Sequence, residues 1–348
     1  MDAQSPPPPA IPADDDELHQ MLVAKFRSRT ISSWALTAPA IPSLIDEYID
    51  TCDKMLVPVS RPWASLTRED KRDMLAPTIQ EAFDASPRSR VTLDWDSNTD
   101  VLRISARVQS ISDSYDSWLD DRGWAPFGTH ADARVWLLAE ELSGGRRDIP
   151  ILDIGAGVGR NAIALARHGY PVDAVELAPR FAAQIRANAD YLELTNIRVL
   201  ACDVFDTEDL RDDYQLIFAA EVATDWQFAQ CRNLFELAAK RLAPGGLLLF
   251  SAFIARQGYT PTQVARELGQ HALCRPFTAD EMTEAAAGLP LELIADDSVY
   301  DYEKGHLPKE AWPPAIWFEA WATGNNLFAG APDASPMQLR WLVYRRNY

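Results

Sequence analysis

Three glycines at alternate positions, Gly155, Gly157 and Gly159, follow an apolar run that contains Asp153, and a helical pattern begins directly after them. Glycine lets the backbone approach a ligand closely, and the start of a helix offers unpaired N–H groups to that ligand. A loop of this kind between a strand and a helix is typical of nucleotide-binding proteins. The sequence therefore predicts a ligand site at residues 153–159.

The spacing of the glycines argues against a nicotinamide dinucleotide. The dinucleotide fingerprint G-x-G-x-x-G would need a third glycine at the position of Arg160. A nicotinamide dehydrogenase is therefore disfavoured.

The segments around this loop alternate between short apolar runs and helical patterns. Predicted strands cover 149–154, 171–177, 197–204, 214–222 and 245–254, and predicted helices between them cover 161–169, 179–192 and 227–243. Helices at 260–272 and 278–288 and strands at 291–299 and 338–346 follow. This alternation is typical of parallel βαβ units, so we expect an α/β fold with a doubly wound, mostly parallel sheet.

The segment "ILDIGAGVG" at 151–159 resembles motif I of the class I S-adenosylmethionine-dependent methyltransferases, which have a seven-stranded Rossmann-like sheet. The resemblance implies S-adenosyl-L-methionine as the cofactor. It implies an acid after the second strand for the ribose hydroxyls, which Glu176 supplies, and a polar residue after the third strand for the adenine amino group, which Asp203 supplies. Val204 would then flank the adenine ring.

Later segments also resemble this family in order and spacing. The fourth strand should end beside the transferred methyl group, where "IFAAEVATDW" places Glu221. The turn at 242–246 precedes a fifth strand, and the strand at 338–346 lies where the family has its antiparallel last strand. The resemblance therefore implies these cofactor-binding residues: Asp153, Gly155, Gly157, Gly159, Glu176, Leu177, Asp203, Val204 and Glu221.

Each acid also has a chemical reason for its role. A carboxylate such as Glu176 can accept both hydrogen bonds of a ribose diol, and Asp203 can accept one from the adenine amine. Asp153 either orients the loop or meets the cofactor's ammonium group through water. The alternative for Glu176 and Asp203 is an ordinary solvated strand end.

The longer segment "GAGVGRNAIALARHGYPVDAVE" is similar to tellurite-resistance-type small-molecule methyltransferases. The D-P-P-Y motif of adenine amino methyltransferases is replaced by "AEVATDW" at 220–226. The function expected is methyl transfer to a small or medium-sized molecule. A catalytically silent protein that binds S-adenosylmethionine or acts as a scaffold is the alternative.

Methyl transfer from a sulfonium depends mainly on holding the nucleophile in line with the methyl group. A protonated nucleophile also needs a base, and Glu221, Asp225 and His130 are the candidates. For His130 a structural role is the alternative, and Glu221 could equally bind cofactor.

Three parts of the chain are expected. Residues 1–20 form a disordered tail rich in Pro and Asp, residues 21–112 an N-terminal cap, and residues 113–348 the methyltransferase domain. In the cap we expect helical patterns at 22–36, 41–56 and 67–85, the last with a Thr-x-x-Asp cap, and a β-hairpin formed by 90–95 and 101–108. An aromatic insertion at about 299–337 either covers the site or packs against the end of the sheet.

The composition disfavours several classes of partner and location. The net charge of −18 disfavours nucleic acid, and the longest apolar runs are far shorter than a membrane span. The N-terminal segment is acidic and proline-rich, unlike a signal peptide.

The four cysteines form no C-x-x-C pair and show no metal-ligand spacing with the histidines, so we expect a cytoplasmic protein without a metal site.

Overall fold

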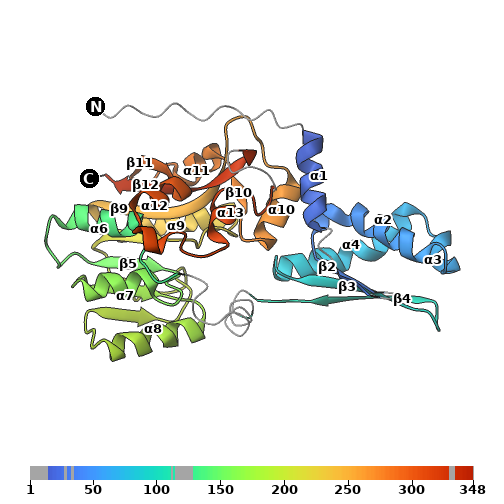
Figure 1. Cartoon of the computed structure of the whole chain (residues 1–348), viewed down its shortest axis with the longest axis horizontal. Helices are drawn as coiled ribbons and strands as arrows, with labels where there is room; N and C mark the ends of the chain where they lie inside the picture. Colours follow the sequence, from blue (N-terminus) through green and yellow to red (C-terminus); the bar gives the residue numbers. More distant parts are fainter. Residues whose placement is uncertain are drawn as a thin grey trace.

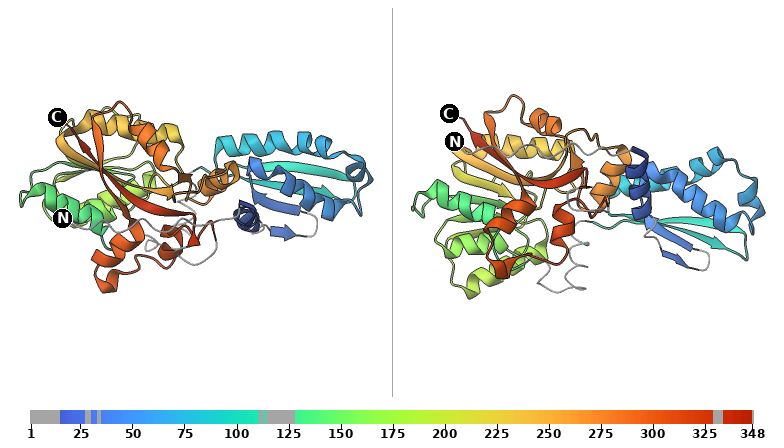
Figure 2. Two further views of the ribbon diagram at one scale, coloured as in Figure 1. Left: turned by 90° about the horizontal axis from the view of Figure 1, so that it is seen from above. Right: turned by 45° about the horizontal axis from the view of Figure 1, so that its top comes forward.

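The computed structural model of the chain describes residues 15–26, 30–32, 35–110, 113, 128–328 and 334–347. These residues form an N-terminal unit, residues 15–110, and an α/β domain, residues 128–347, which lie side by side along the long axis of the molecule (Figures 1 and 2). No helix among the described residues is both long and apolar enough to cross a bilayer.

The α/β domain is built on one mixed sheet. Its seven-strand path runs in the order β11 (Leu291–Ser298), β12 (Met337–Arg346), β9 (Leu242–Ala255), β8 (Tyr214–Ala219), β5 (Ile151–Ile154), β6 (Val172–Val175), β7 (Ile197–Leu200), and the two-residue strand β10 (Pro276–Phe277) pairs with β9. Strands β5 to β9 are parallel, whereas β12 runs antiparallel to both β9 and β11. The predicted doubly wound, mostly parallel sheet and its antiparallel last strand are confirmed.

Helices cover both faces of this sheet (Figure 1). Successive residues of β8 point to opposite faces, so that Leu216 and Phe218 belong to one apolar core and Ile217 to the other. The first core contains residues of α6 (Ala133–Ser143), α7 (Arg160–Arg167) and α8 (Pro179–Tyr191), and the second contains residues of α9 (Phe228–Arg241) and α11 (Ala279–Ala286). The chain runs from β5 to β6 and β7 on one side of the sheet and then crosses to β8 on the other side of β5, so the topological switch point lies between β5 and β8. Open α/β sheets bind ligands outside the carboxyl ends of the strands at such a switch point.

The N-terminal unit has a four-stranded antiparallel sheet in the order β1 (Thr30–Ser32), β2 (Ala35–Pro39), β3 (Arg90–Asp96), β4 (Val101–Arg107). Its helices are α1 (Asp15–Phe26), α2 (Ile45–Leu56), α3 (Arg61–Ser65) and α4 (Arg68–Ala85), with a 3-10 turn at Pro42–Leu44. The β3–β4 hairpin, α2 and the Thr67–Asp70 capping box at the start of α4 are as predicted.

Two predictions in this unit are wrong. The helix expected over 22–36 ends at Phe26, and the chain forms strands from Thr30 because Leu36 and Ala38 are buried at alternate positions against β3. Helix α1 begins at Asp15, inside the segment expected to be a disordered tail. Residues 1–14 and all but one residue of 111–127, where the boundary at 112–113 was expected, lie outside the described residues.

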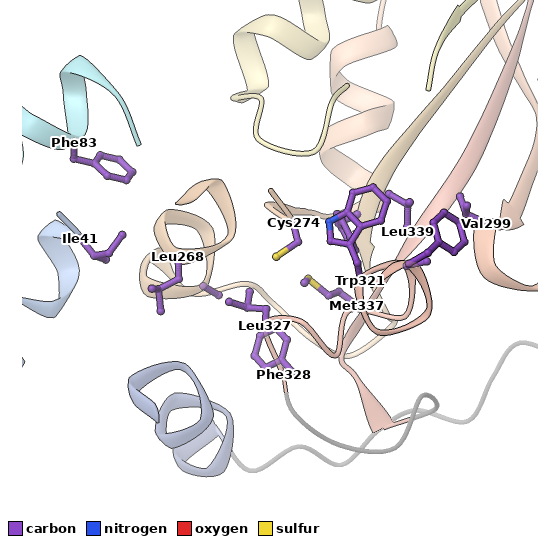
Figure 3. Packing of buried hydrophobic residues seen from close by; sticks show 14 of the residues in the cluster. Ile41, Phe83, Leu268, Cys274, Val299, Trp321, Leu327, Phe328, Met337 and Leu339 are labelled. Carbon is purple, nitrogen blue, oxygen red and sulfur yellow. The ribbon is translucent and has the colours of Figure 1, made fainter. Parts of the chain in front are cut away.

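Helix α10 (Gln263–His271) joins the two units. Leu268 of this helix lies between residues of the N-terminal unit, such as Ile41 and Phe83, and the C-terminal residues Leu327 and Phe328 (Figure 3). Two polar contacts flank this packing: the Ser43 N–H donates to Glu267 Oε2 at 2.8 Å, and His271 Nδ1 lies 2.9 Å from the Pro87 carbonyl oxygen.

The aromatic insertion forms α12 (Val299–His306), a 3-10 turn at Lys309–Ala311 and α13 (Phe318–Ala322). Its rings pack on one another and on the sheet, with ring centroids 5.4 Å apart for Trp317 and Trp321 and 5.3 Å for Trp321 and Phe253 of β9. Glu303 of α12 accepts hydrogen bonds from two amides at the start of α6 and from Trp341 Nε1. Of the two interpretations of the insertion, packing against the sheet accounts for these contacts.

Candidate functional site

A cavity of about 290 Å³ lies at the carboxyl ends of β5, β6, β7 and β8. Loops that leave these strands supply its walls, including the glycine loop after β5 and residues 220–226 after β8. The structure brings together in this lining most of the residues singled out in the sequence, namely Asp153, Gly155, Gly157, Glu176, Leu177, Asp203, Val204, Glu221 and Asp225.

The glycine loop has a backbone that side chains rarely adopt. Gly155, Gly157 and Gly159 have φ angles of 68°, 56° and 86°. A Cβ on Gly155 would lie 2.5 Å from Val222 Cγ2, and one on Gly159 would lie 3.0 Å from Ile163 Cγ1. A Cβ on Gly157 would meet no atom within 4 Å. Gly155 and Gly159 are therefore required by packing, whereas Gly157 keeps space free beside the cavity.

Glu176 closes the glycine loop onto the end of β6. Its Oε2 accepts from the Gly157 N–H and its Oε1 from the Ala178 N–H, both at 2.7 Å. Burial raises the pKa of Glu176, and these hydrogen bonds oppose that shift. The Leu177 amide also donates to this carboxylate, and because a carboxylate has about four lone-pair sites, Glu176 can still accept from a ligand hydroxyl.

Asp153 is buried and lines the same cavity. The Ala162 amide donates to its carboxylate, but Oδ2 has no hydrogen-bond partner among the described residues. Burial raises the pKa of Asp153 well above its usual value, and the nearby Asp132 and Glu176 raise it further. An unpartnered buried carboxylate oxygen is costly, so Asp153 is suited to accept a hydrogen bond from a ligand.

The wall formed by the loop after β7 combines one acid with apolar side chains. Asp203 is exposed, and its Oδ1 accepts from the Phe205 N–H at 2.9 Å. The rings of Phe205 and Trp226 lie 5.7 Å apart, and Val204 and Phe181 line the cavity beside them. This end of the cavity suits a flat apolar group that carries a hydrogen-bond donor at its edge.

Glu221 has an unusual backbone conformation two residues after the end of β8. Its φ angle is 62°, and its N–H donates to Ser251 Oγ at 2.8 Å. Its Oε1 accepts from Arg160 Nη2 at 3.2 Å. Burial raises the pKa of Glu221 to about 7, although Arg160 opposes the shift. Arg160 also makes two hydrogen bonds to Asp132, the residue directly before α6.

The other two candidate bases differ in position. Asp225 lines the cavity, its Oδ2 lies 3.8 Å from Arg88 Nη2 of the N-terminal unit, and burial raises its pKa. His130 does not line the cavity. Its ring contacts Thr129 and lines a separate depression with Trp136 and His306, and only its carbonyl oxygen meets Arg160. The described lining therefore brings together Glu221 and Asp225 but not His130.

Sequence reasoning missed several lining residues. Arg160 was considered as a departure from a glycine pattern and as part of the resemblance over residues 155–176, but no role was assigned to it, although a charge directly after a ligand loop was itself a signal. Phe181 and Phe205 each follow within five residues of a predicted site acid, and this proximity could have indicated them. Ser251, which does not line the cavity but accepts from the Glu221 N–H, lies in an apolar strand and gave no signal.

The described residues contain no group of three or more His, Cys, Asp or Glu side chains placed to hold a metal ion. The four cysteines are free.

Comparisons with known proteins agree with this geometry. Residues 151–246 match a family model described as a methyltransferase domain. The ribosomal protein L11 methyltransferase of Citrifermentans bemidjiense is 29% identical over 186 residues, which cover 47% of this chain and 58% of that protein. The chain thus spans less than two thirds of the length of this curated relative.

Solved structures are similar in fold. A Galdieria sulphuraria protein, provisionally named a sarcosine dimethylglycine methyltransferase, matches with a TM-score of 0.50 at 18% identity, covering 68% of this chain and 99% of its own. A geranyl diphosphate C-methyltransferase from Streptomyces coelicolor A3(2) matches with a TM-score of 0.48 at 19% identity, covering 62% of this chain and 75% of its own. Residues 151–246 are therefore similar to a methyltransferase domain, and the α/β domain around them shares its fold with the Galdieria sulphuraria protein.

Proposed function

We propose that the chain is an S-adenosyl-L-methionine-dependent methyltransferase that acts on a small or medium-sized molecule. The observation that carries this proposal is the meeting of Asp153, Glu176 and Asp203 around the glycine loop in one cavity. Each of these acids can accept hydrogen bonds from a different part of the cofactor.

The lining fits the cofactor group by group. Glu176 would accept from the ribose hydroxyls, and the unpartnered Asp153 Oδ2 would accept from the ammonium group, directly or through water. Val204 and Leu177 would flank the adenine, whose amino group would donate to Asp203.

When bound, the cofactor supplies an electrophilic methyl group on its sulfonium. The chain's part is then to position the acceptor, to exclude water and to accept a proton where the acceptor carries one. Glu221 suits the last role because its pKa of about 7 lies near neutral pH and its carboxylate lines the cavity. Asp225 is the second candidate base.

The character of the cavity supports a small acceptor. Its described lining has five acids and a single basic residue, Arg160, which disfavours a phosphate-rich polymer. The resemblance of residues 155–176 to tellurite-resistance-type enzymes points in the same direction. We also propose that residues 21–112 serve as a cap beside residues 113–348, and that the protein is cytoplasmic, as the cysteine spacing suggested.

Isothermal titration with S-adenosylmethionine tests the proposal. We expect one site in the wild type and binding at least about tenfold weaker in Glu176→Ala, because the ribose would lose charge-assisted hydrogen bonds. Glu141→Ala is the matched control, since Glu141 is an exposed acid of α6 that does not line the cavity.

The absence of binding by the wild type, or equal binding by Glu176→Ala, would contradict the proposal. Binding without methyl transfer to any member of a broad acceptor panel would favour the silent binding or scaffolding protein instead. Thermal melts of both variants check that the fold is retained.

A further inference from the structure

Arg160 is the sole basic side chain among the described residues that line the cavity. It lies one residue beyond the glycine loop, at the start of α7, and its side chain is 10% exposed. An arginine in such a place would recognise an anionic group of whatever the cavity binds.

The two carboxylates that contact Arg160 hold it unequally. Asp132 makes two hydrogen bonds to the guanidinium, one of them at 3.0 Å, and is 2% exposed, outside the cavity lining. Glu221 makes one hydrogen bond at 3.2 Å, is 19% exposed and lines the cavity. Asp132, which also bonds Asn161, is thus the fixed anchor, and Glu221 lies on the side that a ligand can reach.

The charges around Arg160 make the contact with Glu221 replaceable. Asp132, Glu221 and Glu303 all act on this one guanidinium, and the buried Asp153 lies close by. A single cation cannot compensate four buried carboxylic acids, and burial raises the pKa of Glu221, Asp153 and Glu303. The carboxyl of Glu221 is therefore only weakly held by Arg160.

We infer that Glu221 is an internal competitor for Arg160, and that the cofactor's α-carboxylate displaces it when the cofactor binds. This inference rests on the proposed function. The α-carboxylate is the one anionic group of S-adenosylmethionine, and Arg160 is the one cation that the described cavity wall offers. Displacement would leave Arg160 anchored by Asp132 and would free the Glu221 carboxyl beside the acceptor.

The experiment compares two ligands that differ only in this carboxylate. S-adenosylhomocysteine and its decarboxylated analogue, 5′-(3-aminopropylthio)-5′-deoxyadenosine, share the adenosine, the thioether and the amine. The ratio of the analogue's Kd to that of S-adenosylhomocysteine, measured by isothermal titration, therefore reports the carboxylate alone. We expect the wild type to prefer S-adenosylhomocysteine by about tenfold or more.

The same Kd ratio, measured in three variants, tests the roles of Arg160 and Glu221. Arg160→Met should bring the ratio close to one, and Arg160→Lys should lower it because an ammonium lacks the planar fork. Glu221→Gln should raise it, since the competing anion is gone and the isosteric amide preserves the packing. Arg167→Met is the matched control, because Arg167 is an exposed residue of the same helix and should leave the ratio unchanged.

The inference is overturned if the ratio in Arg160→Lys and Arg160→Met equals that of the wild type, or if Glu221→Gln fails to raise it. If Arg160→Met does not fold, Arg160→Lys and Glu221→Gln carry the test. Failure of both ligands to bind the wild type would refute the proposed function itself, whereas binding of both with an unchanged ratio in the variants would refute the competition alone.

Discussion

Gly157→Ala separates the stability of the glycine loop from its ability to bind a ligand. The φ angle of Gly157 is 56°, which costs an alanine about 1–2 kcal/mol, but the new Cβ would meet no atom within 4 Å. The free energy of unfolding should therefore fall by only about that amount. The methyl group would stand at the cavity wall, and overpacking of about 1–3 kcal/mol corresponds to a Kd about 5 to 150 times higher.

Urea unfolding and isothermal titration with S-adenosylhomocysteine measure the two effects. Gly144→Ala is the matched control, because Gly144 at the end of α6 has a φ angle of 53° and equally open surroundings but does not line the cavity. We expect the two variants to lose similar stability and only Gly157→Ala to lose affinity. Unchanged affinity in Gly157→Ala would refute the placement of the ligand against this loop.

Three further variants test the packing and the charges around the site. Gly155→Ala should lower the free energy of unfolding in urea by about 3 kcal/mol, because of backbone strain and the contact of the new Cβ with Val222. Adding Val222→Ala to this variant should restore part of the loss. No restoration would contradict the close approach of Gly155 to Val222. Burial raises the pKa of Glu221 from 4.5 to about 7, so ionisation of Glu221 lowers the free energy of unfolding as the pH rises from about 5 to 8. Glu221→Gln should reduce this fall, measured by thermal unfolding, by up to about 3 kcal/mol. The same pH dependence in the variant and the wild type would count against the burial of Glu221. Asp173 has the opposite pH dependence. Burial opposes its ionisation, but hydrogen bonds from Arg198 and Tyr214 lower its pKa, so ionised Asp173 stabilises the fold above pH 4 and this stabilisation is lost below it. Asp173→Asn should unfold with about 2 kcal/mol less free energy at pH 7 and lose less on acidification, and wild-type stability in that variant would contradict the account.

The sheet was predictable because each βαβ unit is local in sequence. The ends of the strands were less so: β6, β7 and β8 stop at Val175, Leu200 and Ala219, before the predicted ends. Beyond these points the apolar pattern continues because residues such as Leu177 and Val204 line the cavity instead of the sheet. Apolar residues that face a ligand have the same pattern as residues that face a core.

Features that depend on distant partners could not be predicted. Strand β2 exists because it pairs with β3, more than fifty residues later in the chain. The contacts of Arg160 depend on Asp132 and Glu221, which lie on either side of it in the sequence and converge only in the fold. The place of His130 beside a separate depression is equally a matter of tertiary structure.

A crystal structure with S-adenosylhomocysteine is the most direct test of the account. It should show the ligand in the cavity after β5, its ribose hydroxyls bonded to Glu176, its adenine beside Val204 with the amino group at Asp203, and its carboxylate on Arg160. A ligand bound elsewhere, or one in this cavity whose ribose does not contact Glu176, would contradict the central claim.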